Sequence, residues 1–206
     1  MKKCAAMQFM LLICLFLVSC SRNHNEDVYF IHAVGFEGEQ NDISIHALIE
    51  KQSGDGKQEE KDADYFVATV KGQNIRQATK KLSSKYKDCY YATSEFYVIS
   101  ESSSPLLLEH MARELSESNV FPSKSKIICA KERGVSEFLE AVKNEEDLKK
   151  LKKLSDKQKT NIIKFLTQFT SGHSASLPSL SIDSEGKLSS REPAYFKLSQ
   201  ESTKVR

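Results

Sequence analysis

The sequence predicts an α/β (α+β) domain whose core is a mixed β-sheet of about five strands with helices packed on it. Two apolar segments separated by a short polar turn begin the domain, and they predict an antiparallel hairpin. Beyond them, strand-like and helix-like periodicities alternate in the order strand, helix, strand, helix, strand. This alternation implies right-handed crossovers and a sheet that is at least partly parallel.

The hairpin strands are predicted at residues 28–35 and 43–50. Residues 28–35 are almost all apolar, which is typical of a strand buried on both faces. Residues 43–50 instead alternate, and the apolar residues of one face are Ile43, Ile45, Ala47 and Ile49. The polar residues 37–42 predict the turn between the strands. The charged, glycine-containing residues 52–64 predict a mobile loop after them.

Three more strands are predicted at residues 65–70, 95–100 and 126–130, which are short apolar runs rich in β-branched and aromatic residues. Ser104 and Pro105 supply an N-cap and a first-turn proline for one of the intervening helices. The helices are expected at residues 75–86, 104–115, 135–142, 145–159 and 161–169. Periodicity predicts a core that contains Phe30, Ile45, Val67, Phe96, Val98, Met111, Ile128 and Phe138.

These elements place a single α/β domain at residues 28–170. The serine-rich residues 171–206 contain Pro178 and Pro193 and only scattered apolar side chains. That composition predicts a linker or the start of an absent second domain, not a second core.

The N-terminus has the pattern of an export signal. Lys2 and Lys3 precede ten consecutive apolar residues at positions 9–18. Such a run, at about 1.5 Å per residue, covers roughly half of a ~30 Å hydrocarbon core. We therefore predict a signal peptide at residues 1–19 and not a membrane-spanning helix.

The signal ends in Leu17-Val18-Ser19-Cys20, which resembles the lipobox of bacterial lipoproteins. The resemblance implies that Cys20 becomes the mature N-terminus and carries a diacylglyceryl lipid of palmitate type, with residues 20–27 as a membrane tether. Two or more acyl chains anchor a protein stably, whereas one binds marginally. The alternative is an ordinary secretory signal in which Cys20 has no role.

The net charge and the cysteines bear on two further questions, nucleic-acid binding and disulfide formation. The formal charge of +2 falls to zero when Lys2 and Lys3 are removed with the signal, so nothing in the charge favours nucleic-acid binding. Cys89 and Cys129 remain in the domain. They could pair in an exported protein, but we expect two free thiols that pack as small hydrophobic residues.

No combination of residues predicts an active site. His32 and His46 lie on the two arms of the hairpin, where two satisfied sheet histidines are expected, because a metal site needs a third ligand. His110 is expected to be solvated, and the Lys-rich residues 149–153 to form a solvated helix face. Glu101-Ser-Ser-Ser104 lies where backbone amides can bind an anion, but the common phosphate-binding glycine motifs are absent. We predict a non-enzyme without cofactor or metal.

The order of these segments resembles the N-terminal domain of the spore germinant-receptor C-subunit lipoproteins, the Ger(x)C family. The lipobox, the strand at residues 30–35 and the strand at residues 43–49 are similar to family features. So are the junction Val70-Lys-Gly-Gln-Asn-Ile-Arg-Gln-Ala78 and the strand Ser94-Glu-Phe-Tyr-Val-Ile-Ser-Glu101. Residues 176–182 and 194–197 are similar to the stretch that leads into the second domain of the family.

The resemblance implies a lipid-anchored, non-catalytic protein on the outer face of the cytoplasmic membrane, which in spores is the inner membrane. There it is expected to assemble with a receptor A subunit and a polytopic B subunit that respond to nutrients. Only the lipidated cysteine of the family transfers to a residue of this chain, Cys20. The resemblance covers the first of three family domains, so a truncated gene product or a short paralogue is expected.

Two other classes stay open. One is an extracytoplasmic solute-binding or orphan surface lipoprotein, with its cleft at the carboxyl ends of the parallel strands near residues 100–104. The other is a lipid-anchored hydrolase that uses one of the serines.

Overall fold

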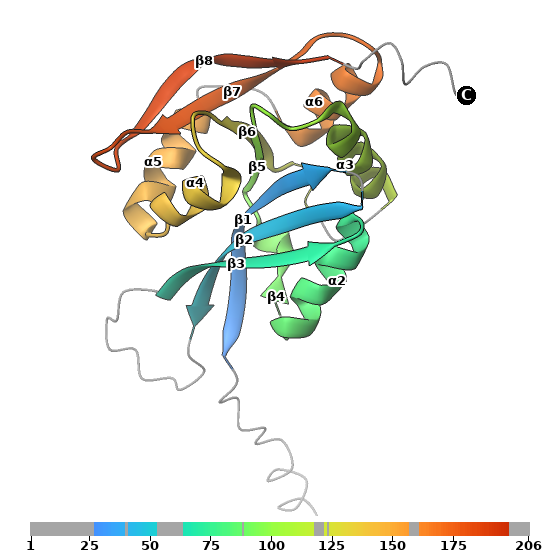
Figure 1. Ribbon diagram of the computed structural model, residues 1–206. Coiled ribbons are helices and arrows are strands. Elements are labelled where there is room, and N and C mark those ends of the chain that lie inside the picture. The colour runs from blue at the N-terminus through green and yellow to red at the C-terminus, as the bar shows by residue number, and fades with distance from the viewer. Residues whose placement is uncertain are drawn as a thin grey trace, which may run out of the picture.

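The computed structural model describes residues 27–39, 41–52, 64–87, 89–117, 122, 124–156 and 161–197. These residues form three layers, in which helices cover both faces of one mixed sheet (Figure 1). The strands lie in the order β3-β2-β1-β5-β6-β7-β8, and β4 also pairs with β1. The predicted α/β class is confirmed, with more strands than the five expected.

The first half of the sheet is antiparallel, as the predicted hairpin requires. β1 (Val28–Glu39) pairs with β2 (Asp42–Gln52), and β2 pairs with β3 (Asp64–Gly72). The register of β1 on β2 shifts between Ile31 and Ala33, so β1 carries a bulge at His32.

The strands from β1 through β5 and β6 to β7 are parallel, because each crossover between them passes through helical segments. β1 pairs with β5 (Phe96–Ser100), β5 with β6 (Lys126–Ala130) and β6 with β7 (Ala175–Ile182), all in parallel. The short β4 (Cys89–Tyr90) pairs with the start of β1, and the 3₁₀ turn η1 (Tyr91–Thr93) follows it.

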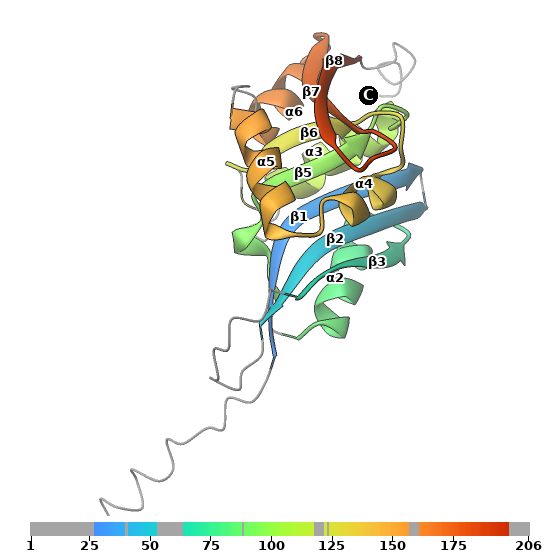
Figure 2. The same ribbon diagram turned by 90° about the vertical axis from the view of Figure 1, so that its left-hand side faces the viewer.

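The five described helices divide between the two faces of the sheet, as Figures 1 and 2 show. One face is covered by α2 (Ile75–Lys85), α3 (Pro105–Glu117) and α6 (Ile162–Thr170). The other is covered by α4 (Val135–Ala141) and α5 (Glu145–Asp156). Each face of the sheet has a hydrophobic core of its own, and alternate residues of the central strands point into one core or the other. On β2, the predicted apolar face that runs from Ile43 to Ile49 packs under α2.

Six of the eight predicted core residues are buried. They are Ile45, Phe96, Val98, Met111, Ile128 and Phe138. Phe30 and Val67 are only partly buried. Val67 lies on the edge strand β3, and Phe30 stacks on the half-exposed Tyr90 with ring centroids 5.7 Å apart.

The structure differs from the expected linker at residues 171–206. β7 forms part of the sheet, and β8 (Leu188–Phe196) pairs with it antiparallel as the edge strand. Six apolar residues of this hairpin are buried against the two cores; they are Ala175, Leu177, Leu180, Ile182, Ala194 and Phe196. The hairpin therefore belongs to the same hydrophobic unit as β1 to β6.

Candidate functional site

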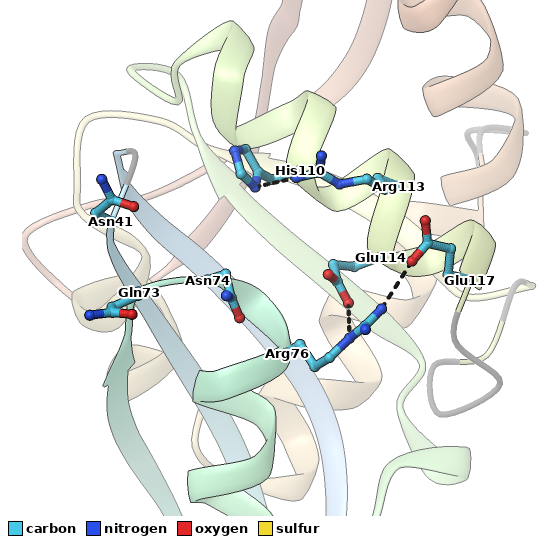
Figure 3. Close-up of a pocket in the computed structure, with 8 residues that line it drawn as sticks. All are labelled: Asn41, Gln73, Asn74, Arg76, His110, Arg113, Glu114 and Glu117. Atoms are coloured by element: carbon cyan, nitrogen blue, oxygen red, sulfur yellow. Dashed lines mark hydrogen bonds and ion pairs between the residues drawn. The ribbon is translucent and has the colours of Figure 1, made fainter.

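A polar hollow of about 390 Å³ lies between the β1–β2 turn, the β3–α2 junction and α3 (Figure 3). It is lined by Asn41, Gln73, Asn74, Arg76, His110, Arg113, Glu114 and Glu117. The hollow lies beside the carboxyl end of β1. At this point β1 has β2, the next strand in the chain, on one side and the later strand β5 on the other. Such a switch in strand order is a common place for ligands in open α/β sheets.

The β3–α2 junction has its shape because of two local features. The Asn74 side chain accepts a hydrogen bond of 2.8 Å from the Gln77 N–H and so caps α2. Gly72, immediately before, lies against the backbone of α2: a Cβ at this position would come 2.6 Å from the nitrogen of Ala78. The close approach places Gln73 and Asn74 at the rim of the hollow.

Two ion pairs cross the hollow from α2 to α3. Arg76 Nε donates to Glu114 Oε2 at 3.2 Å, and its terminal nitrogen donates to Glu117 Oε2 at 2.9 Å. These carboxylates raise the pKa of Arg76, with the hydrogen bond to Glu114 as the largest cause. Across the rim, Arg113 donates to His110 Nδ1 at 3.0 Å. Amides, an imidazole and paired charges suit the binding of a polar solute or of a partner's charged side chains.

The sequence predicts none of this group apart from His110, which it predicts to be solvated; in the structure His110 is partly buried and lies 3.0 Å from Arg113. Glu114 and Glu117 are three residues apart on one helix face, which is a readable pattern. Their partner Arg76 lies on another helix, so no local spacing reveals it. The hollow does not lie at residues 100–104, where the sequence predicts a cleft. At those residues Ser102 and Ser103 hydrogen-bond with Ser100, and Ser104 caps α3 by accepting from the Leu107 N–H.

The two predicted sheet histidines each have a carboxylate of their own on the face that α4 and α5 cover. His32 Nε2 lies 2.7 Å from Glu50 Oε2. The hydroxyl of Tyr65 donates to the same oxygen at 3.4 Å, and burial, followed by the charge of Glu50, raises the pKa of Tyr65 to about 12. This group joins β1, β2 and β3, which agrees with the predicted role as a satisfied sheet residue.

His46 is more deeply buried, with 5% of its surface exposed. Its Nδ1 lies 2.9 Å from Thr69 Oγ1, and its Nε2 lies 3.1 Å from Glu37 Oε2 but out of line for a hydrogen bond. The other Glu37 oxygen accepts from the backbone N–H of Val135 and so caps the start of α4. A hydroxyl, an imidazole and a carboxylate are also the groups of a hydrolase triad. Here the carboxylate holds a helix start, which makes this group part of the framework.

The buried state of His46 predicts a pH dependence of stability that His46→Gln removes. Burial lowers the pKa of His46, an effect larger than the opposing attraction of Glu37. Because the unfolded chain then binds the proton more readily, the native state loses stability as the pH falls through the unfolded value near 6.5. Urea unfolding measures this dependence. As the pH falls from about 8 to about 5, the difference in free energy of unfolding between the wild type and His46→Gln is expected to shrink. A constant difference across this range would contradict the assignment.

Cys89 and Cys129 do not form a disulfide, as predicted. Cys129 is fully buried, and burial raises the pKa of its thiol to about 11, so little thiolate forms at neutral pH. No group of three or more metal-ligating side chains occurs within the described residues. Likewise, no described helix is both long and apolar enough to cross a bilayer. Cys20, the signal peptide at residues 1–19 and most of the tether lie outside the described residues.

Comparison with models of protein families gives a match over most of the chain. The family model described as "Spore germination protein N-terminal domain" matches residues 21–182. Searches of curated proteins and of solved structures found no match. The matched segment begins one residue after Cys20 and extends through β7, so it includes the polar hollow and both histidine groups.

Proposed function

Because the chain belongs to the family of spore germination proteins, through their N-terminal domain, we propose that it is a lipid-anchored, non-catalytic subunit of a germinant receptor. The proposal places it on the outer face of the cytoplasmic membrane, which is the inner membrane of the spore. It acts there by assembly with the A subunit and the polytopic B subunit.

The observation that carries this proposal is the length of the family match. It spans residues 21–182, which include seven of the eight strands and all five described helices. The match thus covers a complete arrangement of sheet and helices, not one motif. It also begins directly after the lipobox-like residues 17–20, which supports a mature chain that starts at Cys20.

The chemistry of the described residues fits a role in assembly. His32 and His46 hold strands and a helix start together, through Glu50 and Glu37. The polar hollow presents paired charges in place of a nucleophile with its base, since Arg76 is held by Glu114 and Glu117. Such a surface recognises charged or amide groups of another molecule through hydrogen bonds.

The anchor is tested by Cys20→Ala. Without a thiol at this position no lipid can be attached, and the protein is expected to leave the membrane fraction. In a pull-down of the tagged protein from detergent-solubilised membranes of dormant spores, the wild type is expected to recover a polytopic partner and the variant none. Cys14→Ala is the matched control, because it removes a signal-peptide cysteine and leaves residues 17–20 intact.

Undiminished membrane retention of Cys20→Ala would overturn the anchor. Membrane recovery of the wild type without a partner would instead favour the second candidate, an orphan lipoprotein that binds a solute. The polar hollow is then the place to look, through a ligand-dependent rise in melting temperature that Arg113→Ala reduces.

A further inference from the structure

The helix α2 and its two flanks carry positive charge only. Residues 71–87 contain six lysines and arginines and no acidic residue. All six are exposed. This contrasts with α5, where lysines pair with acids one turn earlier, as Lys149 does with Glu145 at 2.6 Å. A run of lysines and arginines without acidic partners at this spacing gains no stabilisation from ion pairs within the helix, so helix stability does not explain it.

Four of these cations have no carboxylate partner among the described residues. Arg76 is held by Glu114 and Glu117, and Lys71 lies 4.0 Å from Asp42. The remaining four are Lys80, Lys81, Lys85 and Lys87. Lys81 donates to the backbone oxygen of Lys71, which lies near the carboxyl end of β3 and so away from the end of the sheet where β1 begins. We call the other three residues, Lys80, Lys85 and Lys87, the lysine face of α2.

Aromatic side chains lie at the same end of the domain. Tyr90 on β4 is 50% exposed although it stacks on Phe30. Tyr86, just past α2, has the ammonium of Lys85 5.3 Å from its ring centroid. An exposed tyrosine and lysines at one end of a domain are typical of protein surfaces that meet lipid headgroups, because the ring is amphipathic and the ammonium pairs with phosphate.

The fold places this end next to the start of the domain. Figures 1 and 2 both show α2 beside the end of the sheet where β1 begins, and β4 pairs with the first residues of β1. Only seven peptide steps separate Asp27 from Cys20, which reach at most about 25 Å when fully extended. If Cys20 carries the lipid, as the proposed function holds, this end of the domain cannot be far from the headgroups.

We propose that the lysine face of α2, with Tyr90, binds the anionic lipid surface to which the chain is anchored. The occupant is a bilayer that exposes negatively charged phosphate groups, which attract the three ammonium groups of this face within a Debye length of about 10 Å. This contact fixes the orientation of the domain. It turns the opposite end, with the edge strand β8, away from the membrane.

The test uses the absence of tryptophan from the chain. Tyr90→Trp introduces a single indole at the proposed contact. The lipidated protein is reconstituted in vesicles of phosphatidylcholine, with or without phosphatidylglycerol, that contain a headgroup spin label. Quenching of the indole is expected to be several-fold stronger in the anionic vesicles, and to weaken with added salt. Tyr195→Trp is the control: this position is 73% exposed on β8 and is expected to show equal, weak quenching in both.

Lys80→Gln, Lys85→Gln and Lys87→Gln together, added to Tyr90→Trp, are expected to abolish the difference between the two kinds of vesicle. Because these side chains are exposed, the fold is expected to persist, which circular dichroism checks. Equal quenching of the indole in anionic and neutral vesicles would overturn the proposal. So would a loss of the polytopic partner in the triple variant with unchanged quenching, which would assign the lysine face to a protein.

A second attachment separates this inference from the proposed anchor. The mature chain is held by a histidine tag before Ser21 on a nickel-chelating lipid, so that its tether starts at the same place whether or not Cys20 is lipidated. Anionic quenching that persists in this arrangement supports the lysine face even if lipidation of Cys20 fails. Its absence there refutes the lysine face independently of the anchor.

Discussion

A chain that ends at Gly172 is expected not to fold. This truncation removes β7 and β8, and with them four large buried side chains; these are Leu177, Leu180, Ile182 and Phe196. Burial of each stabilises the fold by about 1.5–3 kcal/mol, or roughly 6–12 kcal/mol for the four together. The whole stability of an ordinary domain is only about 5–15 kcal/mol.

The loss also exposes residues that stay in the chain. Phe196 packs edge-on against Phe165 of α6 with ring centroids 5.8 Å apart, and β6 loses its parallel neighbour. Circular dichroism and denaturant unfolding of the truncated chain are expected to show no cooperative transition. A chain that ends at Lys197 keeps both strands and serves as the control, with native unfolding expected.

Native-like unfolding of the chain that ends at Gly172 would contradict this account. It would show that β7 and β8 are an appendage, as the linker hypothesis for residues 171–206 holds. A chain that ends at Ile182, where the family match also ends, separates the two strands, since it keeps β7 and loses only the edge strand β8.

Gly72→Ala is expected to destabilise the domain by about 2–3 kcal/mol, the upper range for overpacking of a buried site. The new methyl group would lie 2.6 Å from the nitrogen and 3.0 Å from the Cα of Ala78, and 3.0 Å from the oxygen of Asn74. These are backbone atoms, so no side-chain rotation relieves the contact. Relief requires α2 to move away from β3, and with it Asn74 and Arg76 at the polar hollow.

Denaturant unfolding measures the cost, and Gly134→Ala provides the comparison. A Cβ at Gly134 meets only a side-chain oxygen of Glu37, at 3.1 Å, and the position is the N-cap of α4, where this change costs at most about 1 kcal/mol. Equal costs for the two variants would show that the packing of α2 on β3 is looser than the structure has it.

Much of the fold could be predicted from the sequence, because its signals are local. The hairpin, the strands β3, β5 and β6, and all five described helices follow from apolar periodicity, from the N-cap Ser104 and from short polar turns. The buried residues Ile45, Val98, Met111 and Phe138 follow from the same patterns. The family also follows from these segments in their order, and the match over residues 21–182 confirms it.

The hairpin of β7 and β8 could not be predicted because its sequence has the composition of a linker. Pro178 interrupts β7, and it is accommodated where the register on β8 shifts between Leu177 and Ser179. The buried Ser181 is satisfied across the strands, by Ser189 at 3.2 Å and by Arg191 Nε at 2.6 Å. Polar residues with such partners can be buried, but the partners are visible only after the strands have paired.

The amino-acid sequence by itself determined the class of the fold, the order of its first elements, the family and the candidate lipid site Cys20, since each depends on neighbouring residues. Only the tertiary structure decided which distant groups meet. It brings Arg76 to Glu114 and Glu117, Glu37 to both His46 and the start of α4, and the lysine face of α2 to the end where the chain enters the domain. The physical reason is that helix and strand propensities act over a few residues, whereas ion pairs, buried polar contacts and charged surfaces form between segments that only the packed sheet brings together.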